Sequence, residues 1–170
     1  MAVKKKAGAS KKPAATRTET LGLRLDPRLK FALELAARDQ HRSISGTVEW
    51  CVERVLRETE VDIALPGAWT FFDLTHRVWD VDPNKMLANI CAYAPRLATF
   101  EETQKYRIMH MTEQLWYNPG AVRDGSNLVD IEDPLAFAHI VQEILEDGKF
   151  RAISEKELES AGASSMVLPF

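Results

Sequence analysis

A single strand pattern followed by two helix patterns is the feature that most constrains how this chain folds. Over residues 18–25 (TETLGLRL), leucines alternate with Thr20, Gly22 and Arg24, which places the leucines on one face of a β-strand. A lone strand leaves its backbone donors and acceptors unpaired, so another chain or the rest of this chain must complete the sheet. A module of about 40 residues also buries too little apolar surface by itself. Two copies that pair their strands antiparallel and share one core would meet both needs.

Two helices are expected directly after the strand. Asp26-Pro27 is a capping residue followed by proline at the first helical position, which predicts a helix over residues 27–40. Residues 41–45 interrupt this pattern, and Ser45 is expected to cap a second helix that runs to about Glu58. Apolar side chains at strand and helix spacing predict a core shared by two copies, which contains Leu21, Leu23, Leu25, Leu29, Leu33, Val48, Val52 and Val55.

The segment LGLRLDPRLKFALELAARDQHRSISGTVEWCVERVL resembles the ribbon-helix-helix family of DNA-binding proteins, of the Arc and methionine-repressor type. The resemblance covers about residues 18–58. It rests on the alternating strand, on Leu25-Asp26-Pro27 at the junction of strand and helix, and on Arg42-Ser43-Ile44-Ser45 at the start of the second helix.

Three positions depart from the family pattern. His41 stands where a glycine often ends the first helix in a left-handed turn, a conformation that histidine tolerates better than most residues. Gly22 removes one side chain from the expected reading face of the strand. Gly46 and Thr47 are weaker helix formers than the family usually has there.

The resemblance implies a homodimer whose two-stranded ribbon enters the major groove of double-stranded DNA. With the leucines beneath the ribbon, Thr20, Gly22 and Arg24 face the bases, and Arg24 can contact a guanine through two hydrogen bonds. The first amides of the second helix are expected to bind a phosphate. The expected phosphate contacts are Thr18, Arg42, Ser45, Gly46 and Thr47, together with Lys11, Lys12 and Arg17 of the N-terminal arm.

Charge is distributed unevenly along the chain. Residues 1–58 carry 13 Lys/Arg and 7 Asp/Glu, whereas residues 59–170 carry 9 and 18. A basic front of this kind is typical of a segment that binds a polyanion. Residues 1–17 contain several of these cations and no acid, so their composition predicts a disordered arm that lies along DNA and neutralises phosphates. A solvated tail without contacts is the alternative.

The rest of the chain is predicted to be an α-helical domain over residues 61–160, which makes the fold mainly α. Helices are expected to begin at the caps Asp82, Thr99 and Asp133, and to end before Pro95, near Trp116 and before Gly148. Residues 120–130 are expected to form a loop, and residues 161–170 a loose tail. No family resemblance is identified in this part.

Patterns that would indicate catalysis are incomplete. The pairs Asp73/His76 and His110/Glu113 could each share a helix face, but neither has a third partner at a recognisable spacing, and His139 stands alone. We therefore expect no enzymatic activity, no cofactor and no metal site.

The cysteines and the apolar segments of the sequence indicate where in the cell the protein is located. Cys51 and Cys91 have neither the spacing of a metal site nor the number needed for a disulfide framework, so a reducing cytoplasm is expected. The sequence contains no 18-residue apolar run, and the charged N-terminus lacks the apolar core of a signal peptide. These observations predict a cytoplasmic protein without a membrane contact.

These patterns predict a sequence-specific DNA-binding transcriptional regulator, most simply a repressor, that acts as a homodimer. Two alternatives keep the module and give the protein a different role. It could be an antitoxin that represses its own promoter, or an accessory DNA-binding protein of plasmid partition or conjugation. Antitoxins usually bind their toxin through a short, poorly ordered tail, whereas residues 61–160 look foldable. A higher oligomer on DNA, and a protein partner or effector for residues 61–170, stay open.

Overall fold

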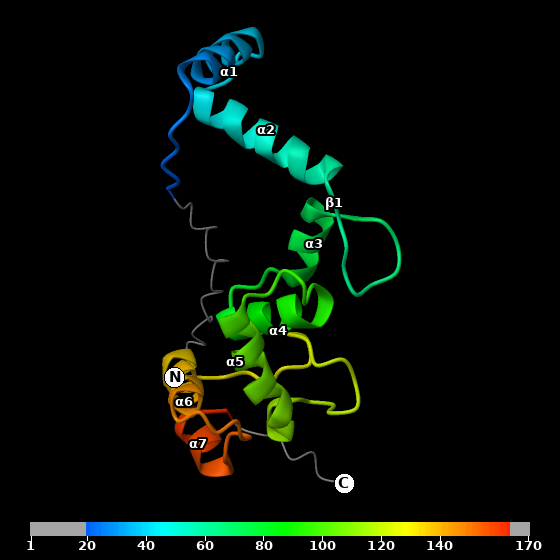
Figure 1. Cartoon of the computed structure of the whole chain (residues 1–170), viewed down its shortest axis with the longest axis vertical. Coiled ribbons are helices and arrows are strands. Elements are labelled where there is room, and N and C mark those ends of the chain that lie inside the picture. The colour runs from blue at the N-terminus through cyan, green and yellow to red at the C-terminus, as the bar shows by residue number, and fades with distance from the viewer. Residues whose placement is uncertain (1–19, 164–170) are drawn as a thin grey trace, which may run out of the picture. The chain divides into compact units, whose positions relative to one another are not determined.

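The computed structural model describes residues 20–163, which form a mainly helical chain with one short two-stranded sheet (Figure 1). The mainly α fold class is therefore confirmed. The chain divides into two compact units at Val48/Glu49, within helix α2 (Ile44–Glu58). Predictions for the arm 1–17 and for Thr18 fall outside the described residues. Among them are the phosphate contacts expected for Lys11, Lys12 and Arg17.

Helix α1 (Pro27–Asp39) forms for the local reasons that the sequence indicates. The Asp26 carboxylate accepts a hydrogen bond from the backbone N–H of Arg28 at 2.8 Å, which satisfies one of the amides at the helix start. Pro27 occupies the first helical position, where the N–H it lacks would have had no partner. The predicted helix is confirmed to within one residue at its C-terminal end.

His41 ends α1 in the left-handed conformation, with φ = 52°. The backbone N–H of His41 donates to Arg38 O at 3.3 Å, and that of Arg42 donates to Ala37 O at 2.9 Å. These two hydrogen bonds make a Schellman motif, in which glycine is the usual left-handed residue. The structure therefore places His41 in the role that a glycine commonly has at the end of such a helix.

The strand expected over residues 18–25 is not present in the single chain. Its described part, Thr20–Leu25, has no regular secondary structure and no ladder hydrogen bonds. The physical reason is that a β-strand is defined by pairing, and no other segment of the described chain lies beside this one as a strand.

The residues expected to form the shared core are not buried in a single chain. Leu21 is 79% exposed, Leu23 54% and Leu29 52%, and Leu33 and Val48 are only partly buried. Val52 and Val55, which lie beyond the boundary between the two units, are 52% and 59% exposed. These side chains are apolar, so their exposure marks an uncovered surface.

The second unit begins within α2 and continues into a short antiparallel sheet. Strand β1 (Glu60–Val61) pairs with β2 (Trp69–Thr70), with Glu60 opposite Thr70. Helix α3 (Phe71–Val78) follows directly. Its N-terminus is a capping box in which the Thr70 hydroxyl accepts from Asp73 N at 3.2 Å and the Asp73 carboxylate accepts from Thr70 N at 3.1 Å.

Four further helices and one 3₁₀ turn complete the unit (Figure 1). In chain order they are α4 (Pro83–Tyr93), α5 (Phe100–Met111), the turn η1 (Glu113–Leu115), α6 (Pro134–Glu146) and α7 (Glu155–Ser160). The predicted caps at Asp82, Thr99 and Asp133 are confirmed, because each side chain accepts a hydrogen bond from a backbone N–H in the first turn. Residues 120–130 form a loop as expected, apart from a single β-bridge between Leu128 and Trp116.

Helix α5 ends five residues earlier than predicted. Thr112 leaves the helix with an extended backbone, and its hydroxyl donates to Ile108 O at 3.0 Å and accepts from Ile153 N at 2.9 Å. The Trp116 indole N–H donates to Met109 O at 3.0 Å. These hydrogen bonds replace the next helical turn, because they satisfy carbonyl groups that a continued helix would have used.

One apolar cluster forms the core of the second unit. Phe137 is completely buried, and Val141 and Ile144 follow it on the same face of α6, as their helical spacing predicts. From α5, Ile108 and Met109 are buried, whereas Met111, the last residue of the helix, is 37% exposed.

The expected loose tail begins later than residue 161. Ala161 and Ala163 are buried, and Gly162 has φ = 66°. The N–H of Ala163 donates to Leu158 O at 3.0 Å, and Asp133 N donates to Ala161 O at 3.1 Å. These contacts fix the end of α7 against the start of α6, which corrects the prediction for residues 161–163. Residues 164–170 lie outside the described part.

Candidate nucleic-acid interface

The three residues expected to face bases precede α1 and are exposed. Thr20, Gly22 and Arg24 have no side-chain hydrogen bond or ion pair with any part of the chain that the structure describes. A Cβ added at Gly22 would meet no atom within 4 Å, so packing inside one chain does not require glycine there. The residues are therefore available to a ligand, and only pairing with a second strand would fix the direction in which they point.

The start of α2 is capped by Ser43 and not by Ser45 as predicted. The Ser43 hydroxyl accepts from Gly46 N at 3.0 Å, and Ser43 O accepts from Thr47 N at 2.9 Å. A Cβ added at Gly46 would lie 3.2 Å from the Ser43 hydroxyl, a tight contact that glycine avoids. Ser45 is one residue inside the helix, where its hydroxyl cannot accept from the first turn.

This cap changes which amides remain to bind a phosphate. Thr47 is fully buried, and its hydroxyl donates to Ser43 O at 3.0 Å, so neither its amide nor its hydroxyl is directed to solvent. The Gly46 amide is also engaged. The amides of Ile44 and Ser45 have no hydrogen-bond partner among residues 20–163. Both lie at the positive end of the dipole of a 15-residue helix, the geometry in which helices bind anions.

An excess of positive charge in the segment that contains this helix start favours the binding of an anion. Residues 20–48 carry five Lys/Arg and three Asp/Glu. Arg42 is exposed and precedes the cap by one residue. Arg42 and Ser45 thus both lie at one helix start, and in the described residues no hydrogen bond joins Thr20 or Arg24 to this site.

The Ser43 cap gives a direct test of this local geometry. We expect Ser43→Ala to destabilise α2 by about 1 kcal/mol, because the Gly46 amide then loses its acceptor. Ser45→Ala is the matched control and should cost less than about 0.5 kcal/mol. Amide hydrogen exchange in the first turns of α2 measures both effects. Equal protection losses in the two variants would contradict the assignment of the cap.

The residues considered for catalysis have structural roles in this fold. The pKa of Asp73 is lowered because its carboxylate accepts hydrogen bonds from Thr70, with which it forms the capping box. His76 packs edge-on against the Phe72 ring, with centroids 4.7 Å apart. Burial, and then the nearby Arg123 guanidinium, lower the pKa of His110. Neither histidine is joined to its predicted acidic neighbour by a hydrogen bond in residues 20–163.

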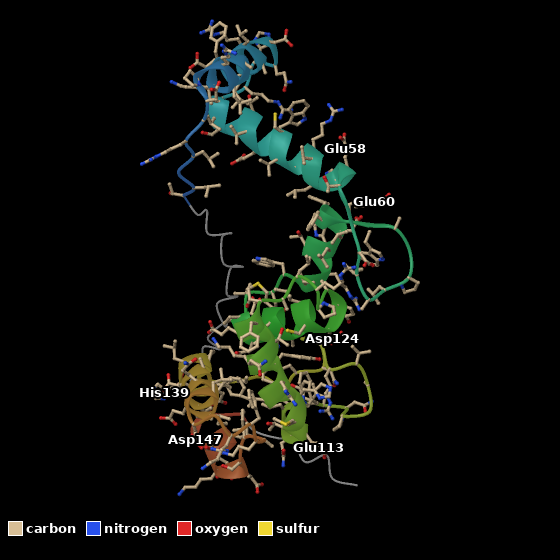
Figure 2. The ribbon with its side chains drawn as sticks, in the orientation of Figure 1. Glu58, Glu60, Glu113, Asp124, His139 and Asp147 are labelled. Carbon is tan, nitrogen blue, oxygen red and sulfur yellow. The ribbon has the colours of Figure 1, made fainter. Side chains whose placement is uncertain are left out.

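His139 lies on α6 with its side chain at the surface (Figure 2), where it is 3.3 Å from the Glu143 carboxylate. Cys91 is buried and burial raises the pKa of its thiol to about 11, so it is poorly suited to act as a nucleophile. In the described part of the chain, no group of three His, Cys, Asp or Glu side chains is arranged to hold a metal ion.

Comparisons with known proteins add no relative: no protein-family model, curated protein or solved structure matches this chain. None of the helices in residues 20–163 has both the length and the apolar character needed to cross a bilayer.

Proposed function

We propose that this chain is a sequence-specific DNA-binding transcriptional regulator that acts as a homodimer through a β-ribbon formed by residues 18–25 of two copies. The observation that carries the proposal is the exposed leucine row before α1. Leu21, Leu23 and Leu25 are 79%, 54% and 39% exposed and alternate with Thr20, Gly22 and Arg24. A strand with one apolar face and one polar face needs a partner for its edge and a cover for its apolar face.

A second copy of the same segment supplies both. Antiparallel pairing would satisfy the backbone groups of Thr20–Leu25 and bring two leucine rows onto the same side of the ribbon. The exposed Leu29 of α1 is a further apolar side chain without a cover. Covering a large aliphatic side chain is worth about 1.5–3 kcal/mol, so these residues together favour association strongly.

The opposite face of such a ribbon would carry Thr20, Gly22 and Arg24 in each copy. A two-stranded ribbon fits the major groove, where the guanine edge offers two acceptors that match an arginine side chain. The amides of Ile44 and Ser45, with the cationic Arg42 beside them, would bind a backbone phosphate and set the register on DNA. The local sequence therefore provides both base readout and positioning.

The second unit helps to decide between a transcriptional regulator and an antitoxin. Residues 49–163 contain their own apolar core and form an ordered helical unit. An antitoxin that used a short, poorly ordered tail would not need this unit, which favours a regulator over that alternative.

Arg24→Ala tests base readout. On the best sequence selected from a random DNA library, we expect the variant to lose about 1–3 kcal/mol of binding free energy and to relax preference at one base pair per half-site. Fluorescence anisotropy titrations of selected and scrambled duplexes measure the loss.

Arg38→Ala is the matched control, since it removes another exposed cation from the last turn of α1, outside the expected reading face. It should weaken both duplexes by the same small factor. If Arg24→Ala and Arg38→Ala behave alike on selected DNA, the segment before α1 does not read bases.

A further inference from the structure

The second unit contains a polar cavity that the proposed DNA-binding role does not use. Its volume is about 380 Å³, enough for a small organic molecule. The end of α3, helix α4 and the loop between η1 and α6 contribute its walls. Asp124, in that loop, is labelled in Figure 2.

The loop wall of the cavity is built around a buried carboxylate. Asp124 is 6% exposed and accepts hydrogen bonds from Ser126 N at 3.0 Å, the Ser126 hydroxyl at 2.6 Å, Asn127 N at 3.2 Å, and the Tyr93 hydroxyl. Burial by itself would raise the pKa of Asp124, but the hydrogen bonds from Ser126, Tyr93 and Asn127 outweigh it and lower the pKa. Both carboxylate oxygens of Asp124 thus accept hydrogen bonds from other residues of the chain. Asp124 therefore stabilises the cavity wall, and other residues of the wall must bind a ligand.

The same loop is attached closely to α4. Asn89 accepts from Gly125 N at 2.8 Å, and a Cβ at Gly125 would lie only 2.6 Å from Lys85 O, so only glycine fits this approach. The Lys85 ammonium is 2.6 Å from the Asp130 carboxylate. Long loops that are held in one conformation by polar contacts are uncommon in compact domains, and they often carry binding sites.

Two oppositely charged side chains on the cavity wall, Arg77 and Asp80, keep unused hydrogen-bonding capacity, although the Asp80 charge also helps to raise the pKa of Lys85. The Arg77 guanidinium stacks on the Tyr93 ring, 4.3 Å from its centroid, and donates one N–H to the Tyr93 hydroxyl at 2.6 Å. Its other N–H donors have no partner in residues 20–163. One Asp80 oxygen accepts from Asp82 N at 2.8 Å, and the other has no partner in the same residues.

Arg77 and Asp80 line one cavity without forming an ion pair with each other. The stacking on Tyr93 holds the guanidinium in place, so its free edge is presented in a fixed orientation, as carboxylate recognition requires. Asp80 is similarly fixed by its turn with Asp82. A ligand that carries both a carboxylate and an ammonium group would complement the two.

Two of the exposed side chains that line the cavity are aromatic, beside the exposed Ser126 and Asp130. Trp79 is 59% exposed and Tyr117 is 55% exposed, although both are large apolar groups. Aromatic rings at the wall of a polar cavity offer flat apolar surfaces for the body of a ligand, and exposed positions of this kind are common at binding sites.

We propose that this cavity binds a free amino acid with an apolar or aromatic side chain. Its carboxylate pairs with Arg77, its ammonium group pairs with Asp80, and its side chain packs against Trp79 and Tyr117. The site is independent of the DNA-binding proposal, since all its residues belong to the second unit.

Isothermal titration calorimetry of the full chain tests this proposal with phenylalanine, tryptophan, leucine and methionine as probes. We expect at least one to bind. For the tightest probe, Arg77→Met and Asp80→Asn should each weaken binding about tenfold or more, because a charge-assisted hydrogen bond is lost. Asparagine keeps the oxygen that accepts from Asp82 N, so the turn survives in Asp80→Asn. Lys156→Met removes an exposed cation outside the cavity and should change the affinity less than about twofold.

Matched probes separate the two halves of the site. 3-Phenylpropionate lacks the ammonium group of phenylalanine, and phenethylamine lacks its carboxylate, so each should bind about tenfold or more weakly than phenylalanine. The proposal is overturned if none of the amino acids binds, if either matched probe binds as tightly as phenylalanine, or if both cavity variants, folded by circular dichroism, keep the original affinity.

Discussion

Leu23→Asp is expected to convert the protein to a monomer and to reduce specific DNA binding by about 100-fold or more. Leu23 is the central leucine of the exposed row, and in a paired ribbon it would lie beneath the sheet in both copies. Aspartate there would bury an unpaired charge twice per dimer, at a cost of several kcal/mol each. Because two strands are needed to fill the major groove, loss of pairing also removes base readout.

Light scattering over a dilution series and titration with selected DNA measure the two losses together. Thr20→Asp is the matched control, because it adds the same charge on the opposite face of the same strand. It should leave the dimer intact and weaken DNA binding only. A Leu23→Asp protein that remains dimeric and binds selected DNA normally would refute the ribbon. So would a wild-type protein that is monomeric at all concentrations.

The second large effect is expected from Phe137→Ala, which should destabilise the second unit by about 3–5 kcal/mol. Phe137 is completely buried at the centre of the apolar cluster, where its removal leaves a cavity between α5 and α6. All four tryptophans of the chain lie at or beyond Glu49, so urea unfolding followed by tryptophan fluorescence reports on this unit.

Leu135→Ala provides the comparison within the same helix. Leu135 lies two residues earlier on α6 and is 84% exposed, so its truncation should cost less than about 0.5 kcal/mol. If the two variants lose similar stability, the apolar cluster around Phe137 is not the core that holds the unit together.

Local signals were sufficient to predict most helix starts. Asp26, Asp82, Thr99 and Asp133 all cap the helices that their spacing indicates. A cap depends on a side chain and on amides two or three residues away, so the few residues involved specify it. His41 likewise takes the left-handed conformation at the end of α1, which short-range backbone geometry permits.

Predictions failed where a distant residue decides the outcome. Helix α5 stops at Met111 because the Thr112 hydroxyl accepts from Ile153 N, 41 residues later in the chain. Residues 161–163 are ordered because Ala161 contacts Asp133. The Ser43 cap differs for another reason: two serines two residues apart are both plausible caps by residue type, and in the structure the Ser43 hydroxyl is the one that accepts from Gly46 N.

For the candidate sites, a feature could be predicted from the sequence only where its residues are close together along the chain. The alternation of leucines with Thr20, Gly22 and Arg24 is a property of the sequence, since a period of two assigns faces without knowledge of the partner strand. The cavity beside Asp124 had no sequence signal. Arg77, Asp80 and Asp124 lie on segments that come together only when α4 packs against the loop 117–130. Hydrogen bonds between residues far apart in the sequence hold this packing in place. The tertiary structure alone therefore places those charges around one space, because their proximity depends on packing across dozens of residues and not on their spacing along the chain.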